Sequence, residues 1–134
     1  MNILSLFDGI SCGIVAAERA GLQVEKYYAS EIDKYAKAVS KKNHPDIIRF
    51  GDVTSWKSWD IDWASIDLLI GGSPCQGFSF AGKQLNFEDP RSKLFFEFVN
   101  ILEHIRQYNH QVLFLLENVR MKKDYKDVIT EMLK

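Results

Sequence analysis

Short apolar runs alternate with helical patterns from one end of this 134-residue chain to the other. Repeated β-α units of this kind build a parallel sheet with helices on its faces. The pattern predicts strands near residues 2–6, 25–30, 47–51, 66–70 and 112–117, and helices near 12–20, 33–43, 91–108 and 124–134. We therefore expect a single α/β domain over residues 1–134, built on a mostly parallel sheet.

Composition, net charge and cysteine spacing argue against several classes of protein. The chain is 46% hydrophobic and 26% charged, with a formal net charge of -1, so an overall basic field that would indicate a free-standing DNA-binding protein is absent. Cys12 and Cys75 lie too far apart in sequence for a zinc motif or a disulfide framework, which favours a reducing cytosol and predicts no metal site. No basic leader or apolar run of transmembrane length is visible, so we expect a cytoplasmic protein without a membrane partner.

A cysteine follows the fourth predicted strand. Residues 66–70 form an apolar run, and the segment that follows, Gly71-Gly72-Ser73-Pro74-Cys75-Gln76-Gly77-Phe78-Ser79, reads as a loop. Loops at the carboxyl ends of parallel strands are where ligands bind in open α/β sheets. A lone cysteine is more often a small buried residue, but this context favours a thiol presented to a substrate. The irregular segment 76–90 that follows is long enough to predict an active-site lid.

Three further features follow the first three predicted strands. Residues 7–13 form a glycine-containing turn before a helix that Ser11 can cap and Gly21 can end. Glu31 follows the second strand, where an acid can bind both ribose hydroxyls of an adenosine ligand, and Asp52 follows the third. An acid of this kind, taken alone, is more often a solvated loop residue or a helix cap. Together, at successive strand ends, they predict a nucleoside pocket. The tryptophan-containing segment 56–63 instead predicts packing under a connecting turn.

These segments, in this order, resemble the cytosine carbon-5 DNA methyltransferases. The resemblance is carried by Phe7-Asp8-Gly9, Glu31, Gly51-Asp52-Val53, Ser73-Pro74-Cys75-Gln76, the segment 91–96 and Leu116-Glu117-Asn118-Val119. It implies a Rossmann-like fold that uses S-adenosylmethionine, and a substrate cytosine that is flipped out of duplex DNA at a cost of a few kcal/mol.

The resemblance also implies roles for residues of the loops. Cys75 would attack carbon 6 of cytosine as a thiolate, and Glu117 would bind the ring edge and stabilise a proton on the adjacent ring nitrogen. Pro74 would fix the direction of the thiol, and Asn118 would order the backbone between the sites. The substrate loop and lid would include Gln76, Gly77, Phe78, Ser79 and Arg91.

For the cofactor, the resemblance implies contacts from the first strands. Phe7, Ile32 and Leu94 would wall the adenine, Glu31 would hold the ribose and Asp52 would bind the adenine amino group. The turn itself would contribute Asp8, Gly9, Ser11 and Gly13.

Members of this family continue well past the Glu-Asn-Val element. The resemblance therefore implies a partial catalytic domain of a bacterial or phage enzyme, truncated after about five strands and without the target-recognition region. Such a fragment is expected to be inactive alone, and to self-associate or bind a complementing C-terminal polypeptide. The alternatives are a non-catalytic module that binds the cofactor or a partner, which needs neither Cys75 nor Glu117, and a Rossmann oxidoreductase, which the lack of a full Gly-x-Gly-x-x-Gly disfavours.

Overall fold

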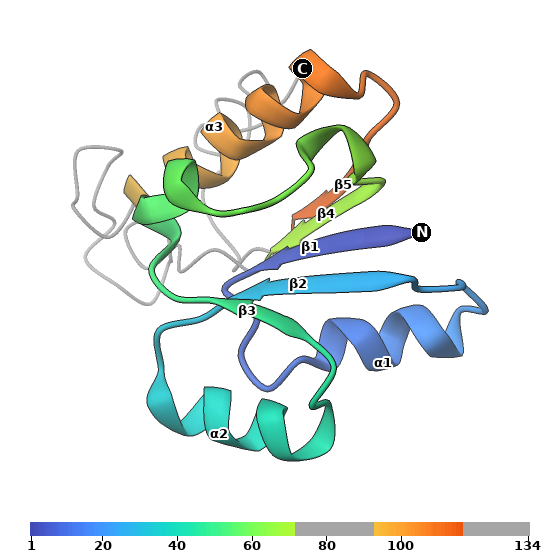
Figure 1. Ribbon diagram of the computed structural model, residues 1–134, viewed down its shortest axis with the longest axis vertical. Coiled ribbons are helices and arrows are strands. Elements are labelled where there is room, and N and C mark those ends of the chain that lie inside the picture. Colours follow the sequence, from blue (N-terminus) through green and yellow to red (C-terminus); the bar gives the residue numbers. More distant parts are fainter. Residues whose placement is uncertain (72–92, 117–134) are drawn as a thin grey trace, which may run out of the picture.

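The computed structural model describes residues 1–71 and 93–116, which form a parallel five-stranded sheet with helices on both faces (Figure 1). The strands are β1 (Asn2–Leu6), β2 (Lys26–Ser30), β3 (Ile48–Phe50), β4 (Leu68–Gly71) and β5 (Leu113–Leu116). The helices are α1 (Cys12–Arg19), α2 (Lys34–Asn43) and α3 (Lys93–Tyr108), with 3-10 turns η1 (Val53–Ser58) and η2 (Trp63–Ser65). The predicted parallel α/β fold is confirmed, while the helix predicted over 124–134 lies outside the described residues.

The strand order is β3-β2-β1-β4-β5, so the order in which the chain adds strands to the sheet switches from one side of β1 to the other. From β1 the chain steps outward to β2 and β3, and it then returns to place β4 on the other side of β1. Leu6, at the carboxyl end of β1, pairs with Ser30 of β2 and with Gly71 of β4. Ligands of doubly wound sheets bind at this kind of switch point, outside the carboxyl ends of the strands.

Two apolar layers sandwich the sheet. Helix α3 and the two 3-10 turns cover one face, and α1 and α2 lie on the other (Figure 1). The helical spacing on α3 buries Phe98, Leu102 and Ile105 almost completely. Trp56 and Trp59 are buried in the same layer, and Trp59 stacks on Phe50 with ring centroids 4.8 Å apart. The tryptophan segment therefore packs the core, as predicted.

The two ends of α1 are built differently. At its carboxyl end Gly21 has φ +82°, its N–H bonds Glu18 O and the N–H of Leu22 bonds Ala17 O, a Schellman arrangement that confirms Gly21 as the stop. At the amino end the predicted Ser11 cap is wrong. Ser11 adopts a left-handed conformation, and its hydroxyl bonds other side chains instead of the helix N–H groups.

Strand β5 is an edge strand of the described sheet. On the α1 side of β5, Leu113 is 62% exposed and Leu115 is 64% exposed. On the α3 side Leu116 packs against the core. Among the helices of the described ranges, none is long and apolar enough to cross a membrane.

Candidate functional site

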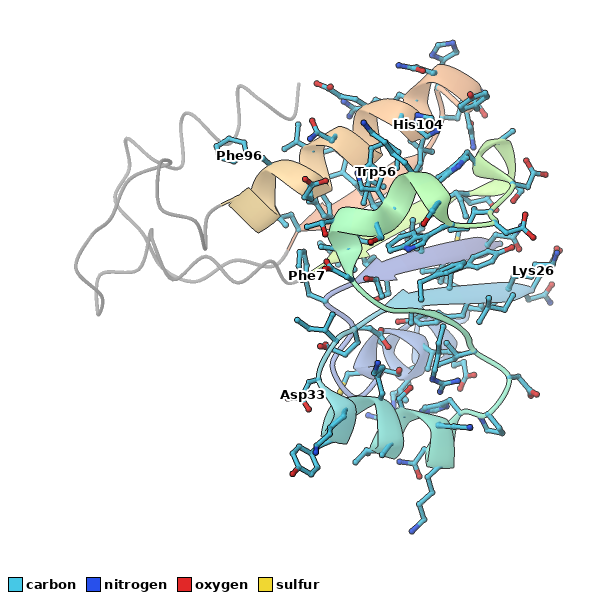
Figure 2. The ribbon with its side chains drawn as sticks, turned by 60° about the vertical axis from the view of Figure 1, so that its left-hand side comes forward. Phe7, Lys26, Asp33, Trp56, Phe96 and His104 are labelled. Carbon is cyan, nitrogen blue, oxygen red and sulfur yellow. The ribbon has the colours of Figure 1, made fainter. Side chains whose placement is uncertain are left out.

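The β1–α1 loop, residues 7–11, lies at the switch point in an unusual backbone conformation. Phe7, Gly9 and Ser11 have φ values of 56°, 62° and 71°. Figure 2 shows where this loop lies: Phe7 and Asp33 are at the end of the sheet where β1 and β2 finish, and Lys26, which begins β2, is at the opposite end. A left-handed conformation costs a non-glycine residue about 1–2 kcal/mol, and such strain concentrates at ligand sites. The loop is thus the first element of a candidate site.

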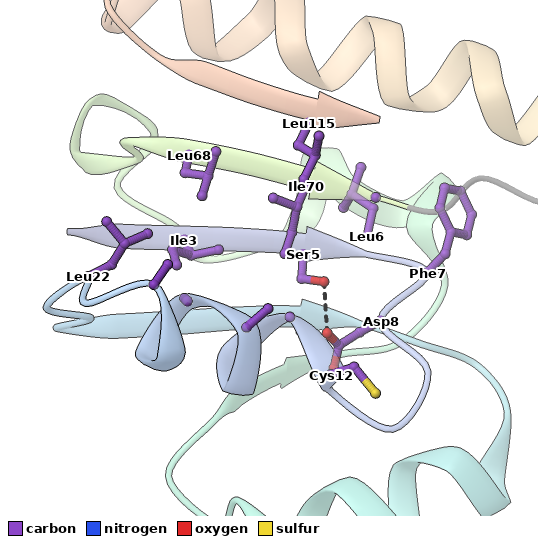
Figure 3. Close-up of a pocket in the computed structure, with 15 residues that line it drawn as sticks. Ile3, Ser5, Leu6, Phe7, Asp8, Cys12, Leu22, Leu68, Ile70 and Leu115 are labelled. Carbon is purple, nitrogen blue, oxygen red and sulfur yellow. Dashed lines mark hydrogen bonds between the residues drawn. The ribbon is translucent and has the colours of Figure 1, made fainter. Parts of the chain in front are cut away.

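The carboxylate of Asp8 holds this loop from inside. Its Oδ1 accepts a hydrogen bond from Ser5 Oγ at 2.7 Å (Figure 3). The same oxygen accepts from Tyr27 Oη at 2.7 Å, and Oδ2 accepts from Ser11 Oγ. Burial, and then the negative charge of Asp8, raise the pKa of Tyr27 far above its ordinary range. Tyr27 therefore remains a protonated donor, and Asp8 is engaged mainly in shaping the loop.

Glu31 joins the carboxyl end of β2 to the same loop. Its Oε1 accepts from Gly9 N at 2.7 Å, and its Oε2 accepts from Ile32 N and Asp33 N, each at 3.0 Å. A carboxylate offers about four acceptor positions, so one position on Oε1 remains beside the loop. One hydroxyl group can bind there directly, whereas a second must displace a backbone N–H.

Asp52, at the end of β3, caps η1. Its Oδ1 accepts from Thr54 N at 2.9 Å, and this bond lowers the pKa of the exposed Asp52 carboxyl. Of the alternatives that the sequence left open for Asp52, the helix cap is the one observed. Ile32, between the two acids in sequence, is 69% exposed and so presents apolar surface at this end of the sheet.

Gly13 has a packing role. A Cβ at this position would lie 2.5 Å from Tyr27 Oη and 2.6 Å from Ile70 Cδ1, closer than any side chain tolerates. The absence of a side chain lets the first turn of α1 lie directly on β2 and β4. Gly13 thus supports the loop through the close approach of helix and sheet.

An apolar groove of about 480 Å³ runs along α1 and reaches the loop at Phe7 and Asp8 (Figure 3). Small residues of α1 form one side of it, and the exposed faces of β4 and β5 form the other, including Ile70 and Leu115. The exposed Cys12 lies at its loop end. Of the residues predicted to bind the cofactor, Phe7, Asp8 and Gly13 line this groove, whereas Glu31 and Asp52 do not.

The residues predicted for catalysis lie outside the described ranges: Pro74, Cys75, Gln76, Gly77, Phe78, Ser79, Arg91, Glu117 and Asn118. Leu94 belongs to α3, but its side chain is not described. The strands that lead to these segments are neighbours. Gly71, the last residue of β4, pairs with Leu116, the last residue of β5, and Glu117 follows Leu116 directly.

Sequence reasoning missed part of the loop's support. Ser40 of α2 and Arg49 of β3 both hydrogen bond toward the loop, and Tyr27 bonds Asp8. Nothing in the local sequence pattern marked these residues, because each partner lies on another element. Within the described ranges, no group of three or more metal-ligating side chains comes together.

Comparison with known proteins identifies the family. A family model described as C-5 cytosine-specific DNA methylase matches residues 1–134, the whole chain. The chain belongs to this family. Its fold is accordingly the Rossmann-like fold of methyltransferases that use S-adenosylmethionine, as the sequence predicted.

Related methylases are substantially longer than this chain. The Type II methyltransferase M.NgoBV of Neisseria gonorrhoeae is 40% identical over 124 residues, which cover 89% of this chain and 28% of that protein. The orphan methyltransferase M.Rho11sI of Bacillus phage rho11s is 38% identical over 122 residues, covering 90% of this chain and 23% of the relative. The chain thus spans about a quarter of the length of these methylases.

A solved structure shares the architecture. The S. pombe Dnmt2 methyltransferase superposes with a TM-score of 0.74 at 26% sequence identity, covering 98% of this chain and 39% of the larger one.

Proposed function

We propose that these 134 residues are the cofactor-binding and catalytic-loop part of a DNA cytosine-5 methyltransferase. The enzyme would transfer a methyl group from S-adenosylmethionine to carbon 5 of cytosine in DNA. The observation that carries the proposal is the family match over the whole chain, residues 1–134. The alternative of a non-catalytic binding module is left as an outcome of the test below.

The described residues fit an adenosine-containing cofactor. Glu31 is held in place by three backbone N–H groups and keeps an acceptor position on Oε1 for a ribose hydroxyl. Phe7 and the exposed Ile32 offer apolar surface for the adenine, and Leu94, whose side chain is not described, would be the third wall. The exposed carboxylate of Asp52, held by Thr54 N, would bind the adenine amino group. When bound, S-adenosylmethionine supplies an electrophilic methyl group.

The loops after β4 and β5 would supply the chemistry. Carbon 5 of cytosine is a poor nucleophile, so we propose that the Cys75 thiolate first adds to carbon 6. A cysteine with a pKa of about 8.5 is only a few per cent ionised at pH 7, so its surroundings must favour the thiolate. Glu117 would hold a proton on the adjacent ring nitrogen, which makes carbon 5 enamine-like. Loss of the carbon-5 proton after methylation would then expel Cys75 and restore the ring.

Other loop residues would position these two groups. Pro74 would fix the backbone before the thiol, and Asn118 would order the chain beside Glu117. Gln76, Gly77, Phe78 and Ser79, with Arg91 beyond them, would close over the flipped cytosine. The pairing of Gly71 with Leu116 supports this arrangement, because Cys75 and Glu117 leave from adjacent strand ends.

We further propose that the 134 residues do not methylate DNA alone. Their relatives are more than three times as long, and the net charge of -1 provides no basic field for a DNA backbone. The remaining length of a relative would supply DNA recognition. Because the relatives come from bacteria and phage, we propose that the protein acts in the cytoplasm of a bacterium, whether the gene is bacterial or carried by a phage.

Two measurements test the proposal. Calorimetry with S-adenosylhomocysteine, the demethylated product, should detect weak binding to the 134-residue chain. Transfer of a tritiated methyl group to DNA should occur only when a polypeptide corresponding to the rest of a relative is added. Binding without transfer in any combination would favour the non-catalytic module, and no binding at all would contradict the cofactor site.

A further inference from the structure

A chain of buried hydrogen bonds connects the β1–α1 loop to α2 and β3. Ser40 of α2 is only 2% exposed, and its Oγ bonds the Oγ of the fully buried Ser11. Arg49 of β3 donates from Nη2 to Ser40 Oγ at 2.9 Å. At the other end Ser11 donates to Asp8. Four side chains from three parts of the fold thus form one continuous path.

The protons of this path have one consistent arrangement. A guanidinium can only donate and an ionised carboxylate can only accept. Because Ser11 gives its single proton to Asp8, Ser40 must give its own proton to Ser11 and accept from Arg49. Every donor therefore points from the cation toward the anion. Bonds to charged groups are the stronger kind, and aligned bonds polarise one another.

The cationic end is anchored outside the loop. Arg49 Nη1 donates to Ile47 O at 3.0 Å, and Nη2 also donates to His44 O at 2.8 Å. His44 is the residue that ends α2. The guanidinium is thus fixed to the α2–β3 connection, and through Ser40 it fixes Ser11.

The loop needs such an anchor because of its strain. Ser11 has φ 71° and no exposed surface, so water cannot replace the Ser40 hydroxyl. Without this partner, the hydroxyl and N–H of Ser11 keep, among the described residues, only their bonds to Asp8. We expect Ser11 then to relax toward ordinary backbone angles, and Gly9 N to leave Glu31 Oε1. We propose that Ser40 and Arg49 are positioning residues that hold the β1–α1 loop in its cofactor-binding form. The proposal rests on the proposed function in one respect, that this loop binds S-adenosylmethionine.

Ser40→Ala tests the proposal with two readouts. In the ligand-free chain, hydrogen exchange at the amides of Gly9 and Ser11 should rise about tenfold or more, whereas exchange at Thr54 N, bonded to Asp52, should not change. In calorimetry the affinity for S-adenosylhomocysteine should fall about tenfold, which corresponds to about 1.4 kcal/mol.

Control variants separate positioning from general destabilisation. Ser40→Thr keeps the hydroxyl and should restore both readouts toward wild type. Ser65→Ala removes an exposed serine hydrogen bond, from Ser65 Oγ to Asp62 O at 2.7 Å, on the other face of the sheet and should move neither. If Ser40→Ala does not fold, Arg49→Lys serves instead, because it keeps the charge but cannot make the three bonds of the guanidinium.

The outcomes are distinguishable. Unchanged exchange at Gly9 and Ser11 in Ser40→Ala overturns the positioning role, and so does an equal rise at Thr54, which would indicate general loosening. Loosened loop amides with unchanged affinity would also overturn it. A wild-type chain that binds no S-adenosylhomocysteine contradicts the proposed function, while the exchange data still decide whether Ser40 holds the loop.

Discussion

Gly13 sets how closely α1 approaches the sheet. Its missing Cβ leaves room for Tyr27 Oη and Ile70 Cδ1, and Tyr27 in turn bonds Asp8. A methyl group here would force these side chains apart, and overpacking of this kind costs about 1–3 kcal/mol. We expect Gly13→Ala to lower the free energy of unfolding by that amount in urea denaturation.

Gly51→Ala is the matched control for that variant. A Cβ at Gly51 meets nothing within 4 Å, and the change should stay within about 0.5 kcal/mol. Equal destabilisation by the two variants would show that the close contact at Gly13 does not govern this packing.

Glu31 links the candidate cofactor site to the loop. Glu31→Ala removes the acceptor for Gly9 N and for a ribose hydroxyl, and a hydrogen bond to a charged group contributes about 1.5–3 kcal/mol. We expect calorimetry to show affinity for S-adenosylhomocysteine at least about tenfold weaker. Glu25→Ala, an exposed acid near the opposite end of β2, should bind like wild type. Equal affinity for the wild type and Glu31→Ala would place the nucleoside elsewhere.

A change at Glu117 is expected to separate cofactor binding from methyl transfer. Glu117→Gln keeps the shape of the side chain but loses the acid that would stabilise the ring proton. We expect unchanged affinity for S-adenosylhomocysteine together with strongly slowed methyl transfer, measured with the remaining polypeptide supplied. Full transfer activity in Glu117→Gln would contradict its assigned role.

At the scale of elements, periodicity predicted the strands and the first three helices within a few residues. Local patterns carry this information because burial repeats with the period of each element. Local patterns do not indicate which polar side chains hydrogen bond to one another. Tyr27 bonds Asp8 across 19 residues, and Ser11 bonds Ser40 across 29, so neither the support of the loop nor the failure of Ser11 as a cap was predictable. The acids at the strand ends were predicted, but the bonds that orient them were not.

The exposed edge strand β5 predicts that copies of the chain associate with one another. Leu113 and Leu115 expose apolar surface on a strand that has an unpaired side in the described sheet. The 134-residue chain produced alone should therefore self-associate in light scattering. Replacing both leucines with lysine should lower the mass toward the monomer, whereas Val39→Lys, on α2, should not. A wild-type chain that stays monomeric would contradict this expectation.

At the scale of the whole molecule, the described residues form a sheet whose carboxyl strand ends meet at one edge, within a chain about a quarter as long as its relatives. The switch point brings the strained loop and Glu31 together. Strands β4 and β5 end as a pair, directly before the two segments that we propose for catalysis. The central claim is that this architecture serves covalent catalysis through Cys75.

Covalent trapping tests that claim most directly. DNA carrying 5-fluorocytosine should be held as a stable adduct, because fluorine replaces the proton whose loss releases the cysteine. With the remaining polypeptide supplied, the wild type and Cys12→Ser should both form a denaturation-resistant complex with this DNA, and Cys75→Ser should form none. A Cys75→Ser protein that still traps the DNA would contradict the account.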